Sequence, residues 1–155
     1  ILKSGLDVVV SKARELMKKY SVSLSHVVAD EDGVGGGCVD FLGCKGFVNG
    51  SRPKKEMIGN EYTIPNYANL KTQCSYKMAE MIVNRKVGEV CTDSNVIKDV
   101  SEEMEQVKQK DIDKDGKIQL VGKDIVKQYI ARSPDEWDSI MMRYYFELEP
   151  QVFFF

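Results

Sequence analysis

The sequence has little of what a zinc protein or a nucleotide-binding protein needs. It contains one histidine, His26, and four cysteines without any C-x-x-C spacing, so no pattern of zinc ligands is present. The phosphate-binding motif G-x-x-x-x-G-K-[ST] is absent throughout. The glycine-rich segment 33–38 carries cysteine where a dinucleotide-binding fingerprint needs its third glycine. These absences exclude the common zinc and nucleotide motifs.

Long apolar runs and an excess of one charge are also lacking. No run approaches the roughly 18–20 residues of a membrane helix, and no signal peptide is visible, so no membrane partner is expected. The formal net charge is −2, so the whole chain has no basic field that would indicate nucleic acid, although a local groove can still be basic. With 155 residues, 43% hydrophobic and 30% charged, the chain is expected to form one cytosolic α/β domain over residues 1–155.

The spacing of apolar residues predicts the main elements. Short strands are expected at residues 27–29 and 117–121, and residues 47–62 resemble a loop. Helices are expected at residues 6–20, 36–42, 66–84, from 94 onwards, at 123–131 and from 133 onwards.

The most informative stretch is the apolar strand that ends in Asp30. Glu31 and Asp32 follow it, and then a run of glycines that allows a tight turn. In an open α/β sheet, ligands collect at the carboxyl ends of strands, and clustered carboxylates suit a hard divalent ion such as Mg²⁺. An acidic turn whose glycines serve geometry alone explains the same residues.

A second group of acids opens the last predicted helix. Ser133, Pro134 and Glu136 fit the N-cap, first and third positions of a capping box. Asp135 and Asp138 lie three residues apart on one face, which leaves them available as metal ligands. A well-capped helix with no further role is the alternative.

Residues 111–118 match the first eight positions of a calcium-binding EF-hand loop, which would span residues 111–122. Asp111, Asp113 and Asp115 occupy positions 1, 3 and 5, and Gly116 occupies position 6. Position 12 should be a glutamate but is Gly122, and a polar turn before a strand explains the same pattern.

Three segments taken together, residues 28–42, 66–71 and 133–138 (S-P-D-E-W-D), resemble the C-terminal nuclease domain of phage terminase large subunits, which has the RNase H-like fold. The resemblance implies a metal-dependent endonuclease that cuts concatemeric viral DNA during genome packaging. It implies that Asp30 and Asp135 are catalytic ligands of two Mg²⁺ or Mn²⁺ ions, with Asp138 as a helper or substitute. It also implies double-stranded DNA, the terminase ATPase domain, the small subunit and the portal as partners, and the host cytoplasm as the location.

The chain departs from this family at its beginning. The family's first acid lies on an antiparallel strand before the first helix, whereas this sequence starts at that helix, where Asp7 reads as a helix-terminal charge. We therefore expect an RNase H-like fold that lacks the first antiparallel strands, with little or no nuclease activity of this chain alone. The alternatives are a non-catalytic calcium-binding or protein-interaction module built on residues 111–122, and a prophage remnant that folds without cutting. Basic residues at 52–55 and Lys71 offer contacts to DNA phosphates.

Overall fold

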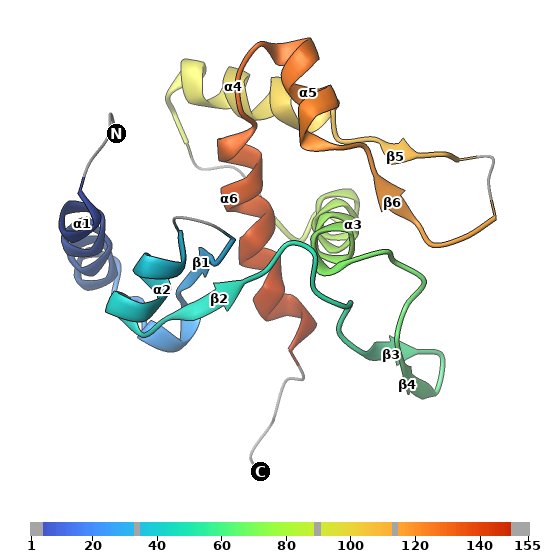
Figure 1. The fold of residues 1–155 in the computed structure, drawn as a ribbon, viewed down its shortest axis with the longest axis horizontal. Helices are drawn as coiled ribbons and strands as arrows, with labels where there is room; N and C mark the ends of the chain where they lie inside the picture. Colours follow the sequence, from blue (N-terminus) through green and yellow to red (C-terminus); the bar gives the residue numbers. More distant parts are fainter. Residues whose placement is uncertain (1–4, 33–34, 89–90, 113–114, 150–155) are drawn as a thin grey trace. The chain divides into compact units, whose positions relative to one another are not determined.

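The computed structural model describes residues 5–32, 35–88, 91–112 and 115–149. The chain forms two compact units, Ile1–Asn49 and Gly50–Phe155, and each is described by itself (Figure 1).

The first unit is a β–α–β arrangement preceded by a helix. Its elements are α1 (Leu6–Lys19), a short 3₁₀ turn (Leu24–His26), β1 (Val28–Asp30), α2 (Gly36–Leu42) and β2 (Lys45–Phe47). β1 and β2 pair in parallel, with Asp30 opposite Phe47, so α2 is the crossover connection that parallel strands require. α2 packs against β1 and α1. The carboxyl ends of both strands therefore lie at the same edge of this small sheet.

Gly35 shapes the turn between β1 and α2. A Cβ atom added at this position would lie 1.8 Å from the backbone carbonyl oxygen of Asp30, which cannot move aside as a flexible side chain could. Only glycine allows the turn to fold back this closely on the end of β1.

The second unit contains the remaining helices and two β-hairpins. Its helices are α3 (Leu70–Val83), α4 (Ser94–Glu105), α5 (Lys123–Ile130), α6 (Asp135–Arg143) and a 3₁₀ helix, η3 (Tyr144–Leu148). The hairpins are β3 (Glu56–Ile58) with β4 (Glu61–Thr63), and β5 (Gln109–Lys110) with β6 (Gln119–Leu120). α6 packs against α3, α4 and η3. Buried Leu70, Cys74, Met78, Trp137, Met141, Tyr144 and Leu148 form most of its core.

The helix expected from residue 66 begins at Leu70 instead. Asn69 caps it, because the Asn69 side-chain oxygen accepts a hydrogen bond of 2.9 Å from the backbone N–H of Thr72. The preceding residues are not helical, and Tyr67 among them forms a parallel bridge with Ile118. Tyr67, which the apolar spacing had placed in a helix, thus pairs with the strand expected at residues 117–121.

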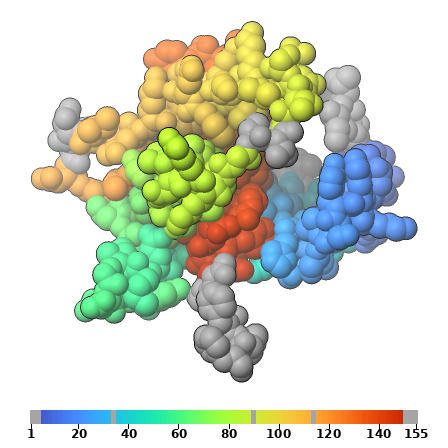
Figure 2. All heavy atoms as spheres, turned by 180° about the vertical axis from the view of Figure 1, so that it is seen from behind, coloured from blue at the N-terminus to red at the C-terminus, as the bar shows by residue number. Residues whose placement is uncertain are grey.

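Residues 47–62 are only partly a loop, because β3 and β4 form a hairpin within them. This hairpin stands on the surface of the second unit (Figures 1 and 2). The apolar side chains of this hairpin are largely exposed: Met57 is 62%, Ile58 49% and Tyr62 46% exposed. Because neither face of the hairpin is buried, its sequence lacks the alternation of apolar and polar residues that predicts a strand.

The α/β class expected from the sequence is confirmed, although in the described residues the strands form only three two-stranded sheets. Across the part of the chain that the structure describes, no helix has the length and apolarity needed to cross a membrane.

Candidate metal centre

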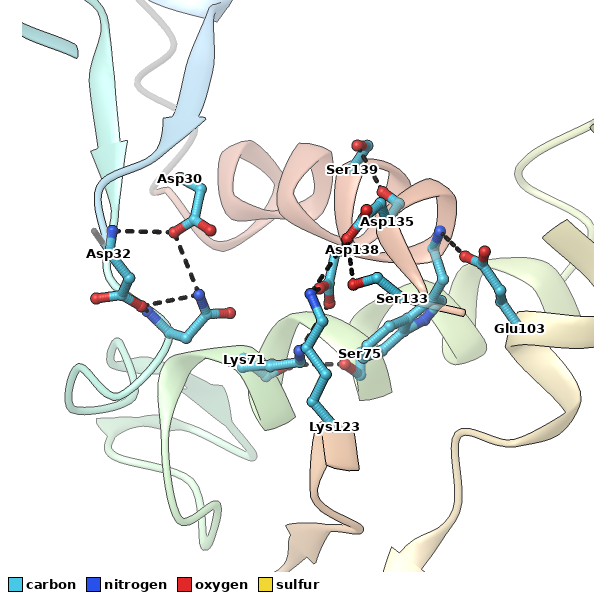
Figure 3. Close-up of polar contacts among 12 residues, drawn as sticks. Asp30, Asp32, Lys71, Ser75, Glu103, Lys123, Ser133, Asp135, Asp138 and Ser139 are labelled. Atoms are coloured by element: carbon cyan, nitrogen blue, oxygen red, sulfur yellow. Dashed lines mark hydrogen bonds and ion pairs between the residues drawn. The ribbon is translucent and has the colours of Figure 1, made fainter. Parts of the chain in front are cut away.

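Asp30 ends β1 and lies in a small polar cluster of the first unit (Figure 3). Its Oδ1 accepts hydrogen bonds from the backbone N–H of Asp32 at 3.0 Å and from Nδ2 of Asn49 at 3.4 Å. Asp32 Oδ2 in turn accepts from the backbone N–H and from Nδ2 of Asn49, both at 2.9 Å. Asn49 follows β2, so the parallel pairing of the strands brings these three side chains together. The side chains are oriented before any ligand binds.

Asp135 and Asp138 lie in the first turn of α6, in the second unit. Asp135 is 72% exposed, whereas Asp138 is only 19% exposed. Asp135, the more exposed of the two, is the metal ligand that the family resemblance implies. Asp138, the more buried one, is its expected helper.

Two lysines hold these carboxylates (Figure 3). Lys123 Nζ donates to Asp138 Oδ2 at 2.8 Å and to Asp135 Oδ1 at 3.2 Å, so one ammonium group bridges both acids. Lys71 Nζ donates to Asp138 Oδ1 at 2.7 Å and lies 4.7 Å from the ring centre of Trp137. Asp138 is therefore paired through both of its oxygens. The two lysines balance the charge of the two acids.

The ionisation of these groups follows from their contacts. The Ser133 hydroxyl, which donates to Asp135 Oδ1 at 2.6 Å, is the main cause that lowers the pKa of Asp135, and Lys123 lowers it further. Partial burial lowers the pKa of Lys123, but the hydrogen bond and charge of Asp138, followed by those of Asp135, outweigh it and raise that pKa above its ordinary value. Asp135 is thus available as a carboxylate at neutral pH.

The capping box expected at residues 133–136 is wrong. Pro134 is the N-cap of α6 and provides no side-chain hydrogen bond, and the Ser133 hydroxyl binds the Asp135 side chain instead. The backbone N–H of Trp137 donates to Oε2 of Glu103, on α4, at 2.7 Å. A residue 34 positions away in sequence therefore provides the capping acceptor.

The structure brings together Asp135 and Asp138 in the second unit, and Asp30, Asp32 and Asn49 in the first. The described residues contain no group of three or more histidine, cysteine, aspartate or glutamate side chains arranged to hold a metal ion. Sequence reasoning missed Asn49 and the pairing of Lys123. It offered Lys71 as a DNA contact. Lys71 lies 67 residues before Asp138, and no sequence rule predicts an ion pair at that separation.

Lys54, from the basic segment 52–55, also has partners inside the chain. Its Nζ lies 3.3 Å from Oε1 of Glu149 and 3.6 Å from the ring centre of Tyr145. Gln73 exchanges two hydrogen bonds with its backbone, at 2.7 and 2.8 Å. Lys54 is therefore a structural residue of the second unit.

The EF-hand-like segment lies in a different setting from that of a calcium loop. An EF-hand loop joins two helices, whereas residues 111–118 join β5 to β6 of an antiparallel hairpin. Asn66 Nδ2 donates to the Gly116 carbonyl at 3.0 Å, which fixes one end of this turn. Asp113 lies outside the described residues.

Comparison with solved structures defines the fold class as that of an RNase H-like nuclease domain, as the sequence resemblance implied. Two of the similar structures are those of the nuclease domain of the large terminase subunit gp2 of the bacterial virus Sf6. One is a lysine-to-alanine variant with manganese and beta-thujaplicinol, and it matches with a TM-score of 0.69 and 19% identity over 92% of this chain and 74% of that one. The same variant with manganese alone matches with a TM-score of 0.69 and 19% identity over 92% of this chain and 75% of that one. No family model and no curated protein matches the sequence.

Proposed function

We propose that this chain is the nuclease part of a phage or prophage terminase large subunit and that it takes part in divalent-metal-dependent cleavage of concatemeric DNA during genome packaging. The observation that carries the proposal is a paired set of acids at the start of α6 within a fold that matches a terminase nuclease domain solved with manganese. By the same resemblance, the partners are double-stranded DNA, the terminase ATPase domain, the small subunit and the portal, in the host cytoplasm.

Asp30, Asp135 and Asp138 are the proposed metal ligands. Their carboxylate oxygens are the hard donors that Mg²⁺ and Mn²⁺ prefer. In the structure, oxygens of Asp135 and Asp138 bind the ammonium groups of Lys71 and Lys123. When bound, a pair of divalent ions would lower the pKa of the attacking water and stabilise the leaving oxygen of the phosphodiester.

The residues of the chain have separate parts in this proposal. Asn49 orients Asp30, and Ser133 keeps Asp135 ionised. Lys71 and Lys123 balance the negative charge of the α6 carboxylates. Asp30 belongs to the first unit, and Asp135 and Asp138 belong to the second.

Metal binding by this chain tests the proposal directly. We expect Mn²⁺ to bind more tightly than Ca²⁺ in calorimetric titrations. We expect Asp30→Asn and Asp135→Asn each to weaken Mn²⁺ binding by about tenfold or more, because even the outer partners of metal ligands change affinity by roughly 10–100-fold. Asp124→Asn is the matched control, since Asp124 also lies in the first turn of a helix, α5.

The alternative hypothesis, a calcium-binding module built on residues 111–122, predicts a different effect of these substitutions on metal binding. If Asp113→Asn abolishes metal binding while Asp30→Asn and Asp135→Asn leave it unchanged, the nuclease proposal is wrong. We expect little plasmid nicking by this chain alone, because only two of the three acids implied by the family have counterparts in it. Strong Mn²⁺-dependent nicking that survives Asp135→Asn would also contradict the ligand assignment.

A further inference from the structure

Glu103 is a buried acid that the proposed chemistry does not use. It lies on α4, is 0% exposed, and is the only acidic residue with a fully buried side chain in the described part of the chain. Burying a carboxyl group is unfavourable unless hydrogen bonds or charges compensate for the lost water. Its contacts therefore indicate what it does.

Both carboxyl oxygens of Glu103 have partners on other elements. Oε2 accepts the hydrogen bond from the backbone N–H of Trp137, in the first turn of α6 (Figure 3). Oε1 pairs with Arg132, which lies in the link between α5 and α6. Arg132 also donates a hydrogen bond of 3.0 Å to the backbone carbonyl of Asp99, which lies on α4 like Glu103. One side chain thus ties α4 to both the link and the start of α6.

This contact caps the start of α6, whose own N-cap, Pro134, provides no side-chain hydrogen bond. The first N–H groups of a helix have no partner within the helix and need an acceptor from elsewhere. Trp137, which receives one from Glu103, lies between Asp135 and Asp138 in the sequence. Fixing the backbone at Trp137 therefore also fixes the backbone positions from which these two side chains extend.

We propose that Glu103 is a positioning residue for the proposed metal-binding carboxylates: by capping α6 from α4, it holds the first turn of α6 in the position in which Lys71 and Lys123 bind Asp135 and Asp138. This inference rests on the proposed function. Stability alone does not require an acid here, since buried ion pairs are often replaceable by apolar residues without loss of stability.

The test compares Glu103→Ala, Glu103→Gln and Glu102→Ala in the full chain. Glu102 is the matched control, because it neighbours Glu103 on α4 and also faces Arg132, at 3.7 Å, but is 44% exposed. Three quantities are measured: hydrogen exchange of the Trp137 amide, the carboxyl ¹³C shifts of Asp135 and Asp138 without metal, and the dissociation constant of Mn²⁺.

For Glu103→Ala we expect exchange at Trp137 to become about tenfold faster, which is the scale of losing a helix cap. The carboxyl shifts of Asp138 should move, and Mn²⁺ binding should weaken by about tenfold, as for other residues that orient metal ligands. Glu103→Gln keeps an acceptor for the Trp137 N–H and should restore most of the protection and affinity. Glu102→Ala should leave all three unchanged.

The proposal is overturned if the folded Glu103→Ala variant keeps wild-type carboxyl shifts and Mn²⁺ affinity, or if Glu102→Ala has the same effects. If Glu103→Ala fails to fold, Glu103→Gln decides: loss of Trp137 protection in a folded Gln variant contradicts the capping role. If wild-type protein binds no Mn²⁺, the proposed function fails, and the exchange rates and metal-free shifts still decide whether Glu103 positions the two acids.

Discussion

Replacing Asp138 by asparagine removes a charge that two lysines share. Asp138 is 19% exposed, and its partners Lys71 and Lys123 are 21% and 37% exposed, with contacts of 2.7 and 2.8 Å. Exposed ion pairs contribute about 0.2–1 kcal/mol, whereas removing one partner of a fully buried pair costs roughly 3–5 kcal/mol. This partly exposed arrangement lies between these limits, so we expect Asp138→Asn to lower the free energy of unfolding by about 1–2 kcal/mol.

Fluorescence of Trp137 is a suitable assay, because this residue is the only tryptophan of the chain and is 3% exposed on α6. In thermal unfolding, the expected loss corresponds to a fall in Tm of roughly 3–6 °C for a chain of this size. Asp135→Asn is the matched control and should lower Tm much less, since Asp135 is 72% exposed. Adding Lys123→Met to Asp138→Asn should recover part of the loss. A variant Asp138→Asn as stable as the wild type would refute the view that the lysines neutralise this acid.

Three further predictions follow from single contacts. Gly35→Ala should destabilise the first unit, because the added Cβ would lie 1.8 Å from the Asp30 carbonyl oxygen. Amide NMR shifts that change only in α1, α2 and β1 would confirm this prediction, and an unchanged amide spectrum would contradict it. Asp135 should titrate below the ordinary pKa of an aspartate in carboxyl ¹³C NMR, and Ser133→Ala should raise that pKa. Because the folded-state pKa is the lower one, the stability that Asp135 contributes is present above the unfolded pKa of about 4 and is lost as the pH falls through the folded pKa. Burial raises the pKa of the Cys74 thiol to about 12, so mass spectrometry should find Cys74 unlabelled by a thiol reagent at pH 8 until the protein is unfolded.

The sequence was most informative where a pattern is local. Helical spacing located α1, α3, α4, α5 and α6, and the acids followed by glycines located the end of β1 and its tight turn. The resemblance to terminase nuclease domains is confirmed for the fold, although it depended on only three short segments.

The sequence was least informative where partners are distant or elements are short. β2 and β5 have three and two residues, too few for an alternating pattern. The cap of α6 comes from Glu103, and the acids of α6 bind Lys71 and Lys123. None of these pairs has a spacing that local rules recognise, so the capping box at Ser133 was the natural but wrong expectation.

The proposed function depends on divalent-metal binding by the carboxylates of Asp30, Asp135 and Asp138. It is tested most directly by titrating Mn²⁺ into ¹³C-labelled protein and following the paramagnetic broadening of each carboxyl resonance. We predict that the carboxyl signals of Asp30, Asp135 and Asp138 broaden as Mn²⁺ is added, whereas the signal of Asp124 does not. An absence of broadening at Asp30 and Asp135, or broadening confined to Asp111 and Asp115, would contradict the proposed function.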